Sequence, residues 1–395
     1  MKLLVLNHFP TILPPNTGGV LRYFHIYNQL SKFYDVTLLS QKYMPEVEEI
    51  EYSPTFREVK IPTNDEQHKI DEQLISEKME PRFSTHAALS CALIKKTPPI
   101  FLDYYNKFYK NTDIIIHESP FTLKYDINFD LGDKPRVYNS HNHEAIFAKE
   151  VWHGKNARKY IQYVTRMEQY LVKNANLVFA TSEEDKNSFI NSFNVSPKNI
   201  KLVPNGVNPN VWHKRKKAHS ISSRKTALFI GSMHEPNIDI VNFIISHLAL
   251  KCETIDFIIA GQCGKQFSNC TLPNIKIMGE VNEEQKLKLF SESDIAINPA
   301  FFGTGTKIKT LEFLSAGIPL VSTAVGVKGM YLQSGKHYVH ATHENFSSTL
   351  NKVIVQTDQL ESISLHGQEH VNTFFSWENI AKKIKIHLNL LGSTK

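Results

Sequence analysis

Residues 298–330 read NPAFFGTGTKIKTLEFLSAGIPLVSTAVGVKGM. The apolar run 294–298 predicts a strand that ends where this stretch begins, and the glycine-rich sequence 302–306 predicts a loop after it. Apolar residues then recur at helical spacing over 306–316, before a Gly and a Pro that end the helix. A second apolar run, 318–323, predicts the next strand. Strand, loop, helix and strand in this order build a parallel sheet, which indicates an α/β fold.

The loop and the start of this helix have the chemistry of an anion site. Gly303 and Gly305 let the backbone come close to a ligand, and the first helical amides and the helix dipole favour a phosphate. Lys307 and Lys309 add positive charge. Glu312 lies about one and a half turns into the helix, where a carboxylate facing the loop could accept two hydrogen bonds from a ribose diol. A tight turn with a solvated glutamate is the alternative, and short glycine motifs alone do not exclude it.

The stretch resembles the signature of the retaining nucleotide-sugar glycosyltransferases of family four, whose GT-B fold has two Rossmann-like, doubly wound parallel-sheet domains facing a central cleft. Residues 316–321, AGIPLV, are similar to the family's small-Gly-x-Pro strand. The family usually has two glutamates eight positions apart. Glu312 matches the second, which the resemblance assigns to the ribose, but Thr304 stands at the first. Some members instead read GTGxKxK, as this chain does over 303–309.

Length and composition restrict the class of protein. A chain of 395 residues exceeds what one core usually supports, so two domains are expected. The net charge of +6 suits an acidic ligand, nucleic acid or an anionic membrane surface without choosing among them. Four cysteines without CxxC spacing indicate reduced thiols. The run 3–6 is too short for a signal-peptide core and no apolar run is long enough to span a membrane, so we expect a cytoplasmic protein, soluble or peripheral at the inner face of the membrane.

A second glycine pair lies near the N-terminus. The sequence predicts a buried strand over 2–7, a turn cluster over 14–19 and a helix over 20–33. In the family, a Gly-Gly loop at this point approaches the donor phosphates and the acceptor. Gly18 and Gly19 match it, with Arg22 placed to help. A plain tight turn is the alternative, because the sequence is not GxGxxG.

Residues 136–144 predict a strand that runs into a polar tip and then a helix. His141, Asn142 and His143 therefore lie at the carboxyl end of a strand, where ligands bind in open α/β sheets. A metal pair is one interpretation, although no third ligand is nearby, and helix capping by Asn142 is another. The resemblance implies a third, in which His141 lies by the donor sugar, and this is the one we favour.

Between residues 64 and 111 the pattern becomes that of polar helices. Residues 65–79 are amphipathic, and aromatic residues recur at helical spacing over 101–109. Such a stripe is usually core. In a glycosyltransferase this segment often shapes the acceptor site, so we expect core for most of it and acceptor contacts from a few side chains.

The second domain follows the turn 204–208, PNGVN, which is similar to the family's crossing between domains. The basic run 214–217 reads as a solvated linker. After a strand over 226–230, many family members place an Arg and a Lys that grip the diphosphate, whereas this chain has Ser-Met-His. The resemblance to a subgroup with GSM here assigns Gly231 and Ser232 to the phosphate site and leaves the charge to the two lysines of the 303–309 loop.

The resemblance implies an N-terminal acceptor-side domain over 1–205 and a donor domain over 206–375, with a C-terminal helix over 376–392 that packs back on the first domain. The remaining apolar runs predict strands over 36–40, 58–61, 114–116, 177–180, 200–203, 257–260 and 275–278, and helices over 156–174 and 281–290.

The implied activity is transfer of a sugar, with retention of configuration, from a nucleoside-diphosphate-sugar to a hydroxyl of a glycan or glycolipid. The acceptor would attack on the face that the diphosphate leaves, and positioned charges would stabilise that diphosphate without a metal or other cofactor. The resemblance assigns catalytic roles to His141 and Lys307. It assigns donor binding to Gly18, Gly19, Gly231, Ser232, Gly303, Thr304, Gly305, Thr306, Lys309 and Glu312.

Three other functions were weighed. A non-catalytic GT-B scaffold that partners an active transferase is favoured by Thr304 and by the missing Arg/Lys pair. A nucleotide-sugar epimerase of the same fold is a minor alternative. An NAD-type dehydrogenase would need GxGxxG after the first strand, which is absent. We expect no nucleic acid partner.

Overall fold

The computed structural model describes residues 1–395 except 16, 78–85, 213–223, 303–305 and 393–395. The chain forms two compact units. The first consists of Met1–Pro204 and Ile380–Lys395, and the second of Asn205–Asn379. The last helix, α14 (Trp377–Gly392), therefore starts in the second unit and contributes most of its length to the first.

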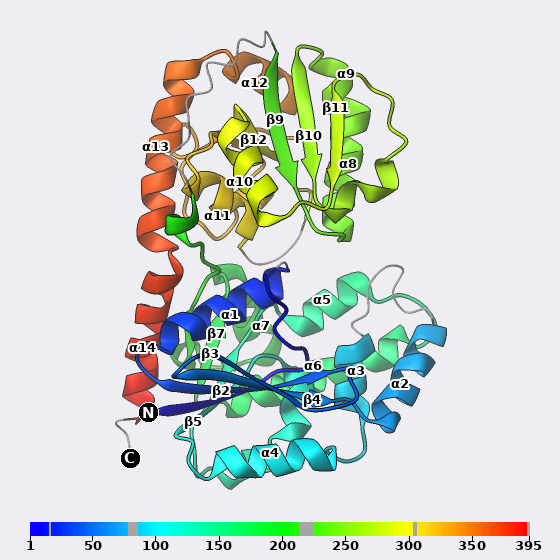
Figure 1. Ribbon diagram of the computed structural model, residues 1–395, viewed down its shortest axis with the longest axis vertical. Coiled ribbons are helices and arrows are strands. Elements are labelled where there is room, and N and C mark those ends of the chain that lie inside the picture. Colours follow the sequence, from blue (N-terminus) through cyan, green and yellow to red (C-terminus); the bar gives the residue numbers. More distant parts are fainter. Residues whose placement is uncertain (16, 78–85, 213–223, 303–305, 393–395) are drawn as a thin grey trace. The chain divides into compact units, whose positions relative to one another are not determined.

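The first unit is built on one eight-stranded sheet with helices on both faces; α1 and α4 lie on opposite sides of it (Figure 1). The strand order is β3-β4-β2-β1-β5-β6-β7-β8, and only the β3–β4 pair is antiparallel. The strands are β1 (Lys2–Leu6), β2 (Asp35–Lys42), β3 (Glu48–Ser53), β4 (Phe56–Pro62), β5 (Ile114–His117), β6 (Arg136–Asn139), β7 (Leu177–Ala180) and β8 (Ile200–Leu202). The helices are α1 (Gly18–Leu30), α2 (Asp65–Ser76), α3 (His86–Leu93), α4 (Pro99–Tyr109), α5 (Glu144–Val151), α6 (Ala157–Asn174) and α7 (Glu183–Phe193).

The central strands of this sheet are buried over their whole length. All four residues of β5, β6 and β7 are buried, as expected of parallel strands that helices cover on both faces. The predicted strands of this unit are confirmed. Strand β3, an edge strand with the polar sequence EEIEYS, was not predicted, because its alternation of apolar and polar residues is too weak to indicate a strand.

In the described part of the polar helical stretch 64–111, the helices are α2, α3 and α4. Asn64 begins α2 with a capping box, in which its side chain and that of Gln67 each accept a hydrogen bond from the other's backbone N–H. In α4, Phe101 and Tyr105 are fully buried in a cluster with side chains of β1, β2 and β4, so the core interpretation is confirmed for these two.

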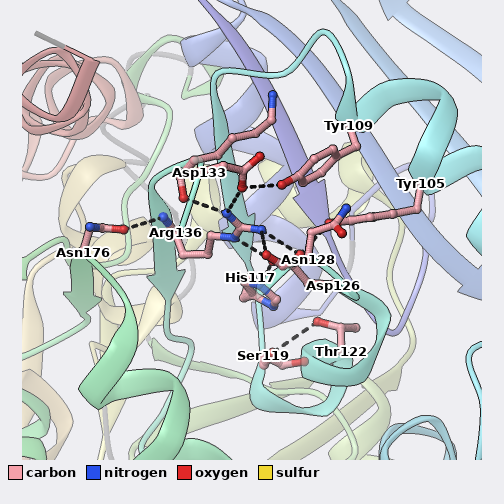
Figure 2. A network of polar contacts seen from close by, with 11 residues as sticks. Tyr105, Tyr109, His117, Ser119, Thr122, Asp126, Asn128, Asp133, Arg136 and Asn176 are labelled. Carbon is pink, nitrogen blue, oxygen red and sulfur yellow. Dashed lines mark hydrogen bonds and ion pairs between the residues drawn. The ribbon is translucent and has the colours of Figure 1, made fainter. Parts of the chain in front are cut away.

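A buried polar network joins the segment after β5 to the start of β6 (Figure 2). The Arg136 guanidinium donates to both carboxylate oxygens of Asp126, each at 3.0 Å, and Tyr105 and His117 contact the same carboxylate at 2.5 and 3.1 Å. Burial opposes ionisation of Asp126, but hydrogen bonds from His117 and Arg136 hold its pKa well below the usual range. The network fixes the two strands whose carboxyl ends carry candidate residues.

The second unit has a six-stranded sheet in the order β11-β10-β9-β12-β13-β14, and every neighbouring pair is parallel. The strands are β9 (Lys225–Ile230), β10 (Ile255–Ala260), β11 (Ile275–Gly279), β12 (Ile295–Asn298), β13 (Leu320–Ser322) and β14 (Val339–His340). The helices are α8 (Glu235–Phe243), α9 (Ala249–Lys251), α10 (Glu283–Glu292), α11 (Ile308–Ser315), α12 (Phe346–Val353) and α13 (Thr357–Phe374), and a π-helical segment, Ile244–Leu248, follows α8.

Alternate residues of β9 enter two different hydrophobic clusters. Ala227 and Phe229 pack with side chains of α8 and α12, whereas Leu228 packs with side chains of α10, α11 and α13. Because successive side chains of a strand point to opposite faces, the sheet is covered on both sides and the unit is doubly wound. Ligands of such sheets bind at the loops beyond the carboxyl ends of the strands.

In the stretch 294–323, strand β12 is followed by helix α11 and then strand β13, in the predicted order. The helix α11 begins at Ile308, two residues later than predicted, and ends at Ser315, two residues before Gly317, which has a φ of 72°. The N–H of Gly317 donates to Leu314 O, and that of Ile318 donates to Phe313 O. This left-handed turn is the glycine-dependent helix ending that the sequence predicts.

None of the described helices is both long and apolar enough to cross a membrane. All four cysteines are free thiols, as their spacing predicts.

Candidate functional site

In the first unit, the candidate residues gather at the carboxyl ends of β5 and β6. His141 lies two residues past β6, and its Nε2 is 2.7 Å from Oε2 of Glu118, the first residue after β5. The Glu118 side chain is fully buried and that of His141 is 12% exposed. The carboxylate therefore holds one ring nitrogen of the candidate catalytic histidine from inside the protein.

Glu118 is the centre of a buried hydrogen-bonded network. Its Oε1 accepts from the Tyr27 hydroxyl and from Asn139 Nδ2, the latter at 2.9 Å. Asn139 in turn accepts from the Arg22 guanidinium at 2.9 Å. Burial lowers the pKa of Arg22 to about 10, although the charge of Glu118 opposes this. Arg22 thus supports the network from inside α1, where it is 1% exposed, and does not project into solvent toward an anion.

The glycine pair is not a turn, which corrects the sequence-based interpretation. Gly18 and Gly19 are the first two residues of α1, and the side chain of Thr17 caps the helix by accepting from the Val20 N–H. A Cβ on Gly19 would lie 3.2 Å from the Phe9 ring and 3.4 Å from His141 Nδ1. The absence of a side chain at Gly19 leaves that second ring nitrogen of His141 uncovered.

His8, which the sequence analysis did not single out, lies next to this network. Its Nδ1 is 2.9 Å from Ser119 Oγ, and its ring packs edge-on against Phe9 and Phe121. Burial, with the nearby His141, lowers the pKa of His8 to about 3. His8 is therefore neutral at physiological pH and can act there as a hydrogen-bonding group but not as a cation.

The polar turn before α5 is held by a carboxylate far along the chain. Asn142 does not cap the helix, contrary to one of the interpretations above: the N-cap residue is His143, without a side-chain capping bond. Glu168 of α6 instead accepts from the N–H groups of Glu144 and Ala145, at 2.9 and 2.8 Å. It also lies 3.0 Å from His143 Nδ1. A distant acid thus supplies the acceptor that the local sequence lacks.

His141 and His143 do not converge on one point. Glu118 holds the first and Glu168 the second, and the described residues contain no group of three His, Cys, Asp or Glu side chains arranged to hold a metal ion.

In the second unit, the end of β9 meets the start of α11. The Lys309 ammonium donates to the amide oxygen of Asn237 in α8, and Asn237 Nδ2 donates to Ser232 O at 3.0 Å. A Cβ on Gly231 would lie 2.9 Å from the side-chain amide carbon of Asn237, so a larger residue there would displace Asn237. Asn237 therefore joins the two predicted phosphate-binding elements, Gly231-Ser232 and Lys309.

The charge of Lys309 depends on its surroundings. Its ammonium lies 4.3 Å from the centre of the Phe229 ring, and burial together with the nearby charge of Lys307 lowers its pKa to about 8. Burial and the charge of Lys309 also lower the pKa of His234, so that His234 is neutral near pH 7. Lys309 and Lys307 supply the positive charge that is absent after β9.

The residues that enter α11 are held by the turn that begins the second unit. The Asn205 backbone N–H and side-chain amide donate to the hydroxyl and carbonyl oxygens of Thr306, both at 2.9 Å. Lys307 is the N-cap residue of α11 and is half-buried. Gly303, Thr304 and Gly305 lie outside the described residues.

The other side of α11 carries Glu312. Its Oε1 accepts from the Lys286 ammonium of α10 at 2.7 Å, and both side chains are largely buried. The loop 325–327 closes over the start of the same helix, because Thr310 Oγ1 and Asn298 Nδ2 both donate to Gly326 O. Glu312 is therefore ion-paired and not a solvated surface acid.

Of the predicted residues, the structure links Lys309 to Ser232 through Asn237, places Glu312 on the other side of α11, and brings Gly19 beside His141. Three residues of these networks were not predicted: Glu118, Asn237 and Lys286. Glu118 follows a predicted strand as directly as His141 does, so the argument used for His141 would have found it. Asn237 and Lys286 lie within helices and have no distinguishing local pattern.

Known families and solved structures are similar to both units of the chain. Residues 17–211 match the family model described as Glycosyltransferase Family 4, and residues 224–356 match the one described as Glycosyl transferases group 1. No curated protein matches the chain.

Among solved structures, sucrose-phosphate synthase from Thermosynechococcus elongatus is 12% identical with a TM-score of 0.73, covering 100% of both chains. Anabaena Alr3699/HepE, solved with UDP and glucose, is 14% identical with a TM-score of 0.69 over 98% of this chain and 99% of that one. WaaG, a glycosyltransferase involved in lipopolysaccharide biosynthesis, is 14% identical with a TM-score of 0.66 over 97% and 99%. These similarities concern the fold, and the two family models add the class of enzyme: the chain belongs to the glycosyltransferases of the GT-B fold.

Proposed function

We propose that this glycosyltransferase moves a sugar from a nucleoside-diphosphate-sugar to a hydroxyl of a glycan or glycolipid, with retention of anomeric configuration. The observation that carries the proposal is the link that Asn237 makes between Lys309 and the Gly231-Ser232 turn at the carboxyl edge of the second sheet, with Glu312 further along the same helix as Lys309. That edge combines a cation and helix-start amides for phosphate with a carboxylate for a diol. A UDP-bound structure, that of HepE, is among the fold's relatives.

The proposed mechanism rests on positioned charge. Lys307 and Lys309, with the amides at the start of α11 and the loop 303–306, stabilise the negative charge on the departing diphosphate. The acceptor hydroxyl attacks on the face that the diphosphate leaves, and a phosphate oxygen takes its proton, so no covalent enzyme intermediate is needed. No metal or cofactor enters this scheme.

His141 is the proposed contact of the first unit with the donor sugar. Glu118 holds its Nε2, which leaves Nδ1, the nitrogen beside Gly19, to face a ligand. The supporting observation is a ring held rigidly by a buried partner, as a positioning role requires.

A thermal-shift screen with UDP, GDP, ADP, CMP and NAD tests the donor site first. A ligand at a hundredfold its dissociation constant stabilises a protein by about 2.7 kcal/mol. A shift with one nucleoside diphosphate supports the transferase and names the donor base. A shift with NAD alone would overturn the proposal.

Two variants then test the assigned residues. Glu312→Ala is expected to weaken binding of the nucleotide, because it removes the acceptor for the ribose. Lys307→Ala is expected to lower turnover more than affinity, since charge on the diphosphate grows in the transition state. Unchanged kinetics in both variants would contradict the proposed donor site.

The second candidate is a non-catalytic GT-B scaffold that partners an active transferase. Two features favour it: Thr304 replaces the usual first glutamate, and the neutral His234 stands where many relatives have a cation. A protein that binds a nucleotide-sugar but neither transfers nor hydrolyses it would support this candidate. An epimerised nucleotide-sugar formed without any acceptor would instead indicate an epimerase.

A glycolipid acceptor would bring the enzyme to the membrane surface, in line with the chain's net charge of +6. Co-flotation with anionic vesicles, compared with neutral ones, tests this cytoplasmic, peripheral placement.

A further inference from the structure

The ion pair between Lys286 and Glu312 has the geometry of a prepared binding element. Lys286 Nζ lies 2.7 Å from Glu312 Oε1, and the two side chains are 16% and 14% exposed. They come from neighbouring helices, α10 and α11, whose apolar residues pack in the same hydrophobic cluster. Both backbones are therefore fixed, and the pair does not depend on two free surface side chains meeting.

The lysine is held from other directions as well. Its ammonium lies 5.7 Å from the centre of the Trp212 ring and 5.9 Å from that of Phe290. These two rings stack at 4.9 Å with an angle of 5° between their planes. Although burial opposes it, the charge of Glu312 raises the pKa of Lys286 above its ordinary value, so the ammonium stays charged.

The pair leaves hydrogen-bonding capacity unused on both partners. Within the described part of the chain, Glu312 Oε2 accepts no hydrogen bond, and the Lys286 ammonium donates one, to Glu312 Oε1. A carboxylate has about four acceptor positions and an ammonium has three donors. Acceptors and donors thus lie side by side, which is what a vicinal diol needs, since each of its hydroxyls both donates and accepts.

We propose that Lys286 is a specificity-determining residue for the ribose: it fixes the Glu312 carboxylate and itself donates to the 2′,3′-diol of the nucleoside diphosphate. This inference rests on the proposed function, which places the ribose at Glu312. Glu312 accepts from the hydroxyls, and Lys286 donates to an oxygen of the same diol. A 2′-deoxyribose lacks one of these hydroxyls, so a hydrogen-bonding position of Lys286 or Glu312 stays without a partner in the complex.

The test measures discrimination and not only affinity. Dissociation constants of UDP, GDP, ADP and CDP, of their 2′-deoxy forms and of inorganic pyrophosphate are determined by calorimetry for the full-length protein. A hydrogen bond to a charged group discriminates by roughly ten- to a hundredfold, so the wild-type protein is expected to prefer the ribonucleotide by at least about tenfold. In Lys286→Met the preference should fall to about twofold, while pyrophosphate binding stays unchanged.

Two controls separate this role from a general effect on folding. Lys288→Met removes another lysine of α10, whose side chain is 71% exposed, and should keep the wild-type preference. Lys286→Arg keeps the charge and should keep part of the preference. Melting temperatures of all variants identify any that fail to fold. If Lys286→Met does not fold, the ribose preference of Lys286→Arg is compared with that of the wild-type protein instead.

The outcomes distinguish the inference from the function it rests on. If Glu312→Gln loses the ribose preference while Lys286→Met keeps it, the donor site stands and Lys286 is only structural. If no nucleoside diphosphate binds the wild-type protein, or if Glu312→Gln binds all ligands unchanged, the proposed donor site fails and the inference fails with it.

Discussion

Lys309 illustrates how one residue's surroundings set its use. Its pKa near 8 means that its charge is partly lost just above neutral pH, whereas the phosphate groups of a nucleoside diphosphate are fully ionised there, with a pKa of about 6. We therefore expect the affinity for a nucleoside diphosphate to fall as the pH rises from 7 to 9.5. Calorimetric titrations across this range check the slope.

The matched variant for this prediction is Lys309→Arg, because a guanidinium has a higher pKa than an ammonium and keeps its charge over this pH range. Its affinity should vary much less between pH 7 and 9.5. Equal slopes for the variant and the wild-type protein would mean that another group controls the pH dependence.

Glu144 is a second residue with an altered charge. Burial and the neighbouring Glu168 carboxylate raise its pKa to about 8, so the folded protein holds a proton there that the unfolded chain releases above its ordinary value of 4.5. This contribution to stability is complete below pH 4.5 and is lost as the pH rises toward 8. Glutamine mimics the neutral acid and should not lose it.

Urea unfolding at pH 5, 6.5 and 8 measures the effect. The free energy of unfolding of Glu144→Gln, relative to wild type, is expected to rise by about 1 kcal/mol or more across this range. Glu150→Gln, at an exposed position of the same helix, is the control and should show a constant difference. A constant difference for Glu144→Gln as well would refute the assignment of a neutral Glu144.

Which residues the sequence could identify depended on how local their signal was. His141, Gly231 and Glu312 could be proposed because each lies at a fixed offset from a strand end or within a short motif. Asn142 was considered as a helix cap, because capping residues are usually adjacent in sequence. The real acceptor is Glu168, 24 residues away, and only the packing of α6 on α5 brings it there.

At the scale of elements, α5 depends on this distant carboxylate. Glu168 accepts from two backbone N–H groups and from the Tyr138 hydroxyl, the last at 2.9 Å. Glu168→Ala leaves these buried donors without a partner, at a cost of about 3 kcal/mol or more in the free energy of unfolding. The variant also removes the repulsion between the Glu168 and Glu144 carboxylates, which offsets only part of this loss of stability.

Chemical denaturation measures the change, with Arg166→Ala as the control on the same helix. Arg166 is exposed, and its removal should change the stability by less than about 0.5 kcal/mol. Similar small effects in both variants would show that α5 does not need the carboxylate.

The elements themselves were largely predictable, and the exceptions have physical reasons. Buried parallel strands such as β5 and β7 are continuous apolar runs, which few other structures produce. The glycines at 18 and 19 were read as a turn because glycine is rare inside helices, but at the first helical positions its cost is small and Thr17 supplies the cap. The polar edge strand β3 could be recognised only from its pairing with β4.

At the scale of the whole molecule, the two units have their own hydrophobic clusters. The clusters of β9 and its neighbours lie entirely within Asn205–Asn379, and those of β1 and β6 within the first unit. Because the nucleotide is expected to bind the second unit, hydrogen exchange with and without a saturating nucleoside diphosphate should slow mainly in peptides of residues 225–330. Protection confined to the first unit would contradict this placement of the donor.

The division of α14 between the units has a consequence for synthesis on the ribosome. Tyr34, next to α1, donates a hydrogen bond of 2.6 Å to Asn389, 355 residues later. At about 5–20 residues per second, the nascent chain must wait roughly 20 to 70 seconds before this contact can form. The second unit is continuous in sequence, so it can finish folding first, although its first residue emerges after residue 204 of the other. The unit that is translated first is thus the last to complete its fold, because it must wait for the residues of α14.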